Sequence, residues 1–185
     1  SIIEGCMFSV NFNKDRHSDF NLIRKAYYNY VSGIVGYGVS SKLTLETEFG
    51  YYINKSQIYA TDPEYNLTGR GFSNLIASAK YNLYTNHKDR IYFSASAGIK
   101  IPFSRTPQQV NNVELPVEVQ PTIGAYGFVF NSYFVKENSE KALRLFITNR
   151  VETNLPNPDD YLLGTAIFTS FYVSKHLMFQ WLKGD

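Results

Sequence analysis

Eight charged side chains of this 185-residue chain fall on the polar side of segments whose other side is apolar. Successive side chains of an extended segment point to opposite faces, so these charges occupy the faces that the apolar residues leave free. Charges that line a pore select ions by sign, whereas mixed charges in a narrow interior pair with one another. The eight predicted lining residues are Lys42, Glu46, Glu48, Lys80, Lys100, Arg144, Arg150 and Glu152.

The signs of these eight charges leave two interpretations open. Five of the residues are Lys or Arg and three are Glu, so the signs nearly balance. A strongly ion-selective channel is expected to show one sign. One interpretation is a salt-bridged plug that fills the interior, and the near balance favours it slightly. The other is an open pore with a polar, mixed-charge lining.

Catalytic and metal chemistry find little support in the residues. Nucleophilic hydrolysis needs a serine beside a histidine that an acid orients. His17 falls in a loop, and His87 and His176 fall in short turns, away from any plausible nucleophile. One cysteine, Cys6, and scattered histidines give no metal-ligand spacing. We therefore expect no catalytic residue, no metal and no cofactor.

Strict alternation of apolar and polar residues defines the elements that carry the eight charges. The clearest case is Arg90–Pro102, where every second residue is apolar over a length of thirteen residues. This period of two predicts a strand with one apolar face, and about 9–11 residues suffice for a tilted strand to cross a membrane. Nine strands are predicted in all: Ile2–Phe12, Lys25–Tyr37, Lys42–Asn54, Ser73–Tyr84, Arg90–Pro102, Val117–Val135, Ala142–Asn154, Tyr161–Val173 and Leu177–Leu182.

The connections between these strands alternate in length. Short connections are expected at 38–41, 86–89, 136–141 and 174–176, and longer ones at 13–24, 55–72, 103–116 and 154–160. Bacterial outer-membrane barrels have short periplasmic turns and longer extracellular loops. Acids in the predicted external loops suit either divalent ions that bridge lipopolysaccharide or turns in solvent. These acids are Asp62, Glu64, Asp159 and Asp160.

Composition agrees with a membrane barrel. Aromatic residues make up 16% of the chain, as expected for aromatic girdles at both membrane interfaces. The formal charge of +2, without a basic run, argues against a nucleic-acid partner. Single-chain bacterial barrels have even strand counts, so nine predicted strands and the lack of a signal peptide indicate a mature or partial sequence.

Several segments resemble a known outer-membrane family. They are Ser32–Tyr51, Gly71–Leu83, Ala97–Pro102, Gln120–Gly127 and Tyr161–Leu182. Together they resemble the transporters of the MetA pathway of phenol degradation, although Asn74 stands where that family usually has Asp, and Phe103-Ser104 replaces its Thr-Gly. The resemblance implies an outer-membrane barrel and a transport role, and it says little about substrate.

We therefore expect a single all-β domain, residues 1–185, that is an antiparallel transmembrane barrel of about 10–12 strands, incomplete in this chain. The expected function is passive transport of small molecules, hydrophobic ones among them, across the bacterial outer membrane, with no enzymatic activity. Its expected partners are membrane lipid, lipopolysaccharide and other outer-membrane proteins. One alternative is a non-conducting accessory barrel in a larger complex. Another is a soluble lipocalin-like carrier, which predicts apolar residues inside and polar residues outside.

Overall fold

A nine-stranded antiparallel sheet forms the body of the protein. The computed structural model describes residues 2–13, 23–60, 63, 65–140 and 142–175, and the side chains among them from Lys25 onward. The strands of this sheet are β1 (Ile2–Asn13), β2 (Ile23–Gly38), β3 (Leu43–Tyr59), β4 (Tyr65–Phe72), β5 (Asn74–Asn86), β6 (Ile91–Pro102), β9 (Gly127–Asn138), β10 (Leu143–Asn154) and β11 (Ala166–Lys175). A separate small hairpin pairs β7 (Gln109–Val110) with β8 (Val113–Glu114). The described residues contain no helix, and so none that could span a membrane.

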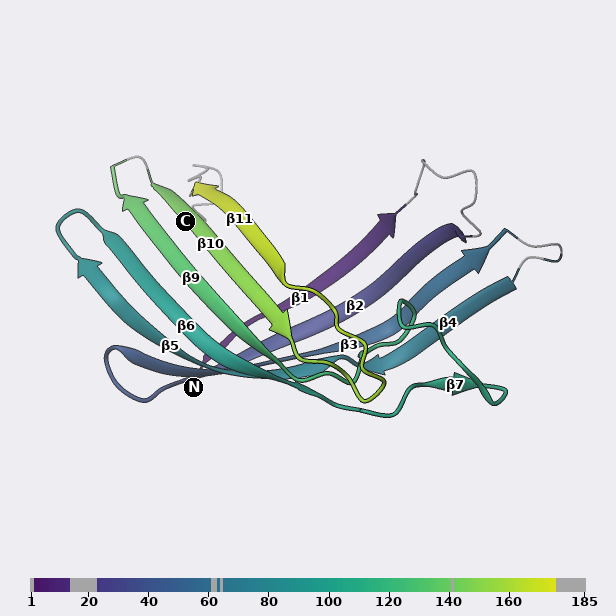
Figure 1. Ribbon diagram of the computed structural model, residues 1–185. Helices are drawn as coiled ribbons and strands as arrows, with labels where there is room; N and C mark the ends of the chain where they lie inside the picture. The colour runs from purple at the N-terminus through teal and green to yellow at the C-terminus, as the bar shows by residue number, and fades with distance from the viewer. Residues whose placement is uncertain (1, 14–22, 61–62, 64, 141, 176–185) are drawn as a thin grey trace.

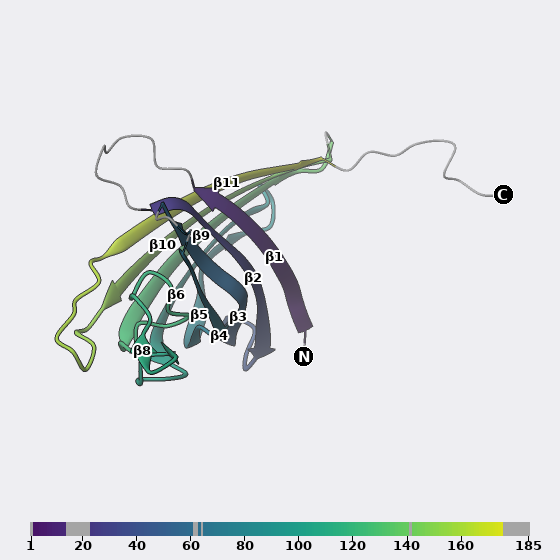
Figure 2. The same cartoon turned by 90° about the vertical axis from the view of Figure 1, so that its right-hand side faces the viewer.

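The sheet is curled into a half-barrel, with β1 and β11 at its two edges (Figures 1 and 2). Its strand order is β1-β2-β3-β5-β6-β9-β10-β11. The seventeen-residue β3 serves two neighbours on the same side, because its first half pairs with β5 and its second half pairs with β4. Within the described residues, β1 pairs only with β2 and β11 only with β10.

Alternation predicted most of the strands well. Six of the nine predicted strands, those that correspond to β1, β2, β3, β5, β6 and β10, start within two residues of the observed strands. The short turns after β2, β5 and β9 lie at one end of the sheet, and the long connections 103–126 and 155–165 lie at the other (Figure 1).

Three predicted boundaries are wrong. The strand expected at Val117–Val135 begins only at Gly127, because residues 115–125 form partly buried turns that include Gly124 at a φ of 72°. The strand expected at Tyr161–Val173 runs instead over Ala166–Lys175. The segment 55–72, expected to be a loop, forms the end of β3 and all of β4. The predicted strand Leu177–Leu182 lies outside the described residues.

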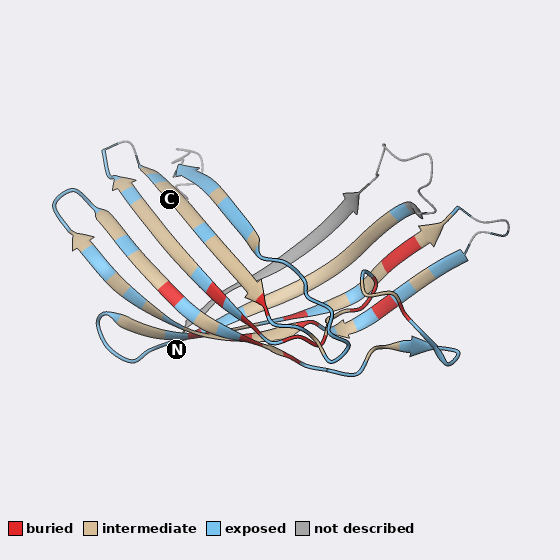
Figure 3. Cartoon of the chain, viewed as in Figure 1, coloured by how far each residue is buried: buried red, intermediate tan, exposed pale blue. Residues whose placement is uncertain are grey.

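Few apolar side chains are buried among the residues whose side chains the structure describes, and none of these lies on the apolar face of the sheet. The buried apolar side chains are Ile76, Leu115, Val119, Ala125 and Val129. Ile76 and Val129 lie on the polar face of their strands, and the other three belong to loop 103–126. Figure 3 shows buried residues where this loop meets the sheet and also along strands such as β6 and β9. The core that the described side chains form is therefore small and lies on one side of the sheet.

Candidate functional site

The strand register separates the sheet into an uncharged face and a charged face. On the uncharged face, residues of neighbouring strands meet directly, as in the pairs Leu45 with Ala79 and Ala97 with Phe130. In the central stretches of β3, β5, β6, β9, β10 and β11, the described residues of this face include no Asp, Glu, Lys or Arg. Those stretches are 43–53, 75–83, 91–101, 128–134, 143–153 and 167–173.

Large apolar side chains on this uncharged face remain open to solvent. Ile167 is 71% exposed, Phe171 63% and Leu83 56%. A water-soluble protein rarely exposes a contiguous apolar surface of more than a few hundred Å². Because this surface covers six strands, it requires a non-aqueous environment or another covering surface.

The charged face carries an ion-pair network centred on Arg150. Arg150 donates from Nη1 to Glu48 Oε2 at 2.8 Å and from Nε to Glu152 Oε1 at 2.6 Å. Lys100 donates from Nζ to Glu152 Oε2 at 3.2 Å, and its side chain is only 6% exposed. Four of the predicted lining residues therefore form one connected network.

The network shows which face of the sheet is concave. Arg150 lies on β10 and Glu48 on β3, with β5, β6 and β9 between them. In a flat sheet, strands four places apart are separated by roughly 19 Å, which is much further than a single ion pair reaches. The sheet must therefore curl toward its charged face, and the side chains of this face project into the hollow. This arrangement is the reverse of the one that a lipocalin-like carrier requires.

The other predicted lining residues are distributed along the same face. Lys80 pairs with Glu46 at 3.0 Å, and its ammonium lies 4.5 Å from the centre of the Tyr133 ring. Arg144 lies at the start of β10 and pairs with Glu137 at 2.6 Å. Lys42 is exposed in the turn that precedes β3, so it lies at the end of the sheet rather than within a strand.

Sequence reasoning missed several residues of this face. Glu137 bridges Arg144 and, at 4.0 Å, Arg90. It falls in segment 136–141, expected from the sequence to be a short connection, whereas β9 extends to Asn138. Tyr30 and Tyr52 stack with ring centres 4.6 Å apart, and the Tyr30 hydroxyl lies 3.2 Å from Ser73 Oγ. A tyrosine is counted as apolar in a hydropathy pattern. Only its position on the polar face of a strand would therefore have identified it as a residue of the concave face.

Gly50 provides the space that Tyr30 occupies. A Cβ at this position would collide with the Tyr30 hydroxyl and ring. We expect Gly50→Ala to lower the free energy of unfolding by about 1–3 kcal/mol, as overpacking does. The control is Gly36→Ala on the same face, because a Cβ there meets Thr44 Cγ2 at an ordinary 3.5 Å. Urea unfolding of both variants measures the effect, and equal midpoints would contradict this account of Gly50.

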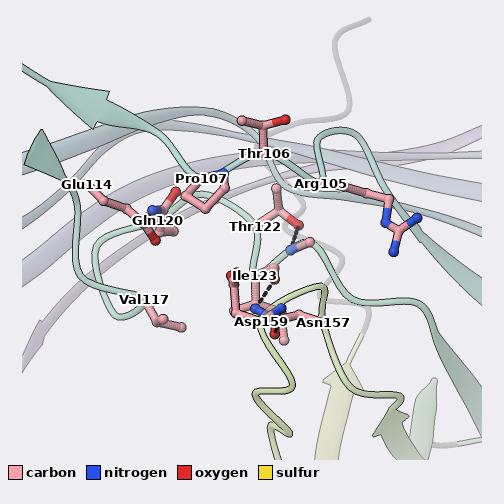
Figure 4. Close-up of a pocket in the computed structure, with 11 residues that line it drawn as sticks. Arg105, Thr106, Pro107, Glu114, Val117, Gln120, Thr122, Ile123, Asn157 and Asp159 are labelled. Atoms are coloured by element: carbon pink, nitrogen blue, oxygen red, sulfur yellow. Dashed lines mark hydrogen bonds between the residues drawn. The ribbon is translucent and has the colours of Figure 1, made fainter. Parts of the chain in front are cut away.

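A small cavity lies between loop 103–126 and loop 155–165, where Asn157 Nδ2 donates to the Ile123 carbonyl at 3.2 Å (Figure 4). Its volume is about 20 Å³, enough for little more than one water molecule. Asn157 Oδ1 also accepts from the backbone N–H of Asp159 at 3.0 Å, which suits a turn-forming role for this segment. The cavity is therefore a small gap where two loops pack together rather than a ligand site.

The described residues offer no cluster of three or more His, Cys, Asp or Glu for a metal ion. His87 lies in the turn between β5 and β6, with its ring 6.4 Å from that of Tyr92. His17, His176, Asp62 and Glu64 fall outside the described residues. A scan against protein-family models finds no match, and neither does a comparison with curated proteins.

Proposed function

We propose that this chain is part of the wall of a β-barrel in the bacterial outer membrane, with its concave face lining a passage for small molecules. The single observation that carries the proposal is the contrast between the two faces of one sheet. The convex face is apolar, exposed and uncharged across its central stretches, and the concave face holds the ion pairs. Membrane barrels place apolar residues toward lipid and polar residues toward the lumen.

The length and arrangement of the strands support the same proposal. Eight of the nine strands contain ten or more residues, and about 9–11 tilted residues cross a bilayer. An open sheet edge in lipid leaves backbone groups unsatisfied, so a barrel of about 10–12 strands would need further strands to join β1 and β11. The resemblance to transporters of the MetA pathway of phenol degradation agrees with passive transport.

A second candidate function rests on the network itself. Arg150 and Glu48 join strands that lie four places apart, so their side chains occupy the hollow rather than only its wall. A barrel whose interior is filled in this way would conduct poorly. Such a barrel would serve as an accessory subunit that contacts other outer-membrane proteins through its loops and its lipid-facing surface.

Reconstitution of the full-length protein distinguishes these functions. We expect the protein to insert into liposomes, to resist extraction at alkaline pH and to give discrete conductance steps in a planar bilayer. Insertion without conductance would contradict the passage and favour the accessory barrel. Failure to associate with lipid would contradict both proposals.

A further inference from the structure

Loop 103–126, which joins β6 to β9, folds back over the concave face of the sheet. In Figure 1 it is the teal-to-green segment that carries β7 and runs beneath β4. Val119 within the loop is fully buried, and Gln120 is almost so. A loop that merely projected into solvent would not bury these residues.

The contacts of the loop place it on the concave side. The Lys55 ammonium lies 5.4 Å from the centre of the Tyr52 ring, and Tyr52 also packs against Tyr28 on the concave face. Gly69 of β4 lies opposite Lys55 in the register. Loop residues that touch Lys55 and Gly69 therefore lie inside the curl of the sheet.

Two glycines of β4 form a seat for the loop backbone. A Cβ at Gly69 would collide with the carbonyl oxygen of Val119 and would lie 3.2 Å from Gln108 Oε1. Gly71 has a φ of 143°, which side chains rarely adopt, and Pro121 packs at 3.5 Å from the position of its missing Cβ. Gly69 thus leaves the space that the loop backbone occupies, and Gly71 allows the backbone conformation of the strand beside Pro121.

Hydrogen bonds fasten the loop to this seat. Lys55 Nζ donates to the Gln120 carbonyl at 2.8 Å. The Gln108 side chain accepts from the Arg70 N–H at 3.1 Å and donates to the Arg70 carbonyl at 3.3 Å, as a neighbouring strand would. The amide of Gln120 in turn donates to the Leu115 carbonyl at 2.8 Å. The loop thus satisfies backbone groups at the free edge of β4 through Gln108. Through Gln120 it also stabilises its own turns.

A second anchor lies nearer to β9. The Thr122 hydroxyl donates to Asn74 Oδ1 at the start of β5, at 2.8 Å. The Asn157 amide holds the Ile123 carbonyl from loop 155–165. The loop is therefore held against β3, β4, β5 and a neighbouring loop by hydrogen bonds.

We propose that loop 103–126 is a fixed constriction that sets the size limit for solutes at this end of the passage. This inference rests on the proposed function. A space of about 230 Å³ remains beside the loop, with Tyr28, Lys55, Gln57 and Glu118 in its lining. This volume is below the 300–1,000 Å³ of sites for drug-sized ligands. Since Lys55 and Glu118 carry opposite charges, the lining of this pocket favours solutes of neither sign.

Thiol labelling tests whether the loop is seated. In a Cys6→Ser background, we expect Val119→Cys to react slowly with a maleimide because Val119 is fully buried. Adding Gly69→Val should unseat the loop and accelerate labelling at least about tenfold. Gly38→Val is the matched control, because a Cβ there meets nothing within 4 Å, and it should leave the rate unchanged. Fast labelling without Gly69→Val would overturn the inference.

Conductance tests whether the seated loop narrows the passage. We expect Gly69→Val to raise the unit conductance of the full-length protein in a planar bilayer by about twofold relative to wild type and Gly38→Val. Should Gly69→Val fail to fold, Lys55→Met removes the bond to Gln120 without adding volume at the seat, and it should change both readouts in the same direction. If Gly69→Val is labelled faster than wild type but has the same unit conductance, the loop is seated as described but does not narrow the passage. That result would overturn the constriction and leave the proposed passage standing. A lack of channels in every variant, wild type included, would overturn the proposed passage itself.

Discussion

Ile147→Arg should reduce membrane insertion severalfold, whereas Thr148→Arg at the next position should not. Ile147 lies in the middle of β10 on the convex face, and it pairs with Phe134 and Phe171 on the neighbouring strands. Thr148 lies on the concave face and pairs with Tyr133 and Ser170. A positive charge on the lipid face of a barrel costs about 2–4 kcal/mol at the bilayer midplane, while a lumen-facing charge stays in water.

The two variants carry the same added charge on the same strand, so they differ only in the face that receives it. We expect Ile147→Arg to reduce the fraction of protein folded into liposomes severalfold, and Thr148→Arg to fold nearly as well as wild type. The measurement is the heat-dependent shift in electrophoretic mobility after folding into lipid vesicles. Equal folding of both variants would show that the convex face does not contact lipid. Loss of folding only in Thr148→Arg would reverse the proposed orientation of the sheet.

Periodicity predicted the strands but not the surfaces that cover them. In β6, an uninterrupted alternation of apolar and polar residues specified both the strand and its faces. In β4, the concave-face positions include Gly69 and Gly71, because loop 103–126 lies directly on them. Two glycines leave no apolar alternation to detect, so the segment resembled a loop. The inward fold of loop 103–126 depends on the same contacts, which join residues about fifty positions apart.

The charges show a similar limit. Alternation correctly placed Glu48, Lys100 and Arg150 on one face, since a strand fixes the direction of each side chain. It could not assign their partners. Arg150 and Glu48 lie four strands apart, and they form an ion pair only because the sheet is curled. The ion pairs agree with the interpretation of a salt-bridged interior, and the open pore stays a prediction that conductance would test.

Arg150 is the residue whose loss should most change the electrostatics of the hollow. It neutralises Glu48 and shares Glu152 with Lys100. Arg150→Gln leaves Glu48 without its ion-pair partner, so the concave face gains one uncompensated negative charge. Breaking a fully buried pair costs about 3–5 kcal/mol. Since the Arg150 side chain is 27% exposed and faces a polar hollow, we expect about 2 kcal/mol of destabilisation instead.

The same change should alter ion preference if the passage conducts. A wild-type lining of nearly balanced sign should discriminate weakly between cations and anions, whereas Arg150→Gln should shift the reversal potential in a salt gradient toward cation selectivity. Glu48→Gln removes one negative charge from the concave face while Arg150 keeps its pair with Glu152, and it should shift the reversal potential toward anion selectivity. The double variant Arg150→Gln/Glu48→Gln restores the wild-type charge, so its reversal potential should return close to that of wild type. Identical reversal potentials in all four proteins would show that permeating ions do not pass this network, even if conductance is present.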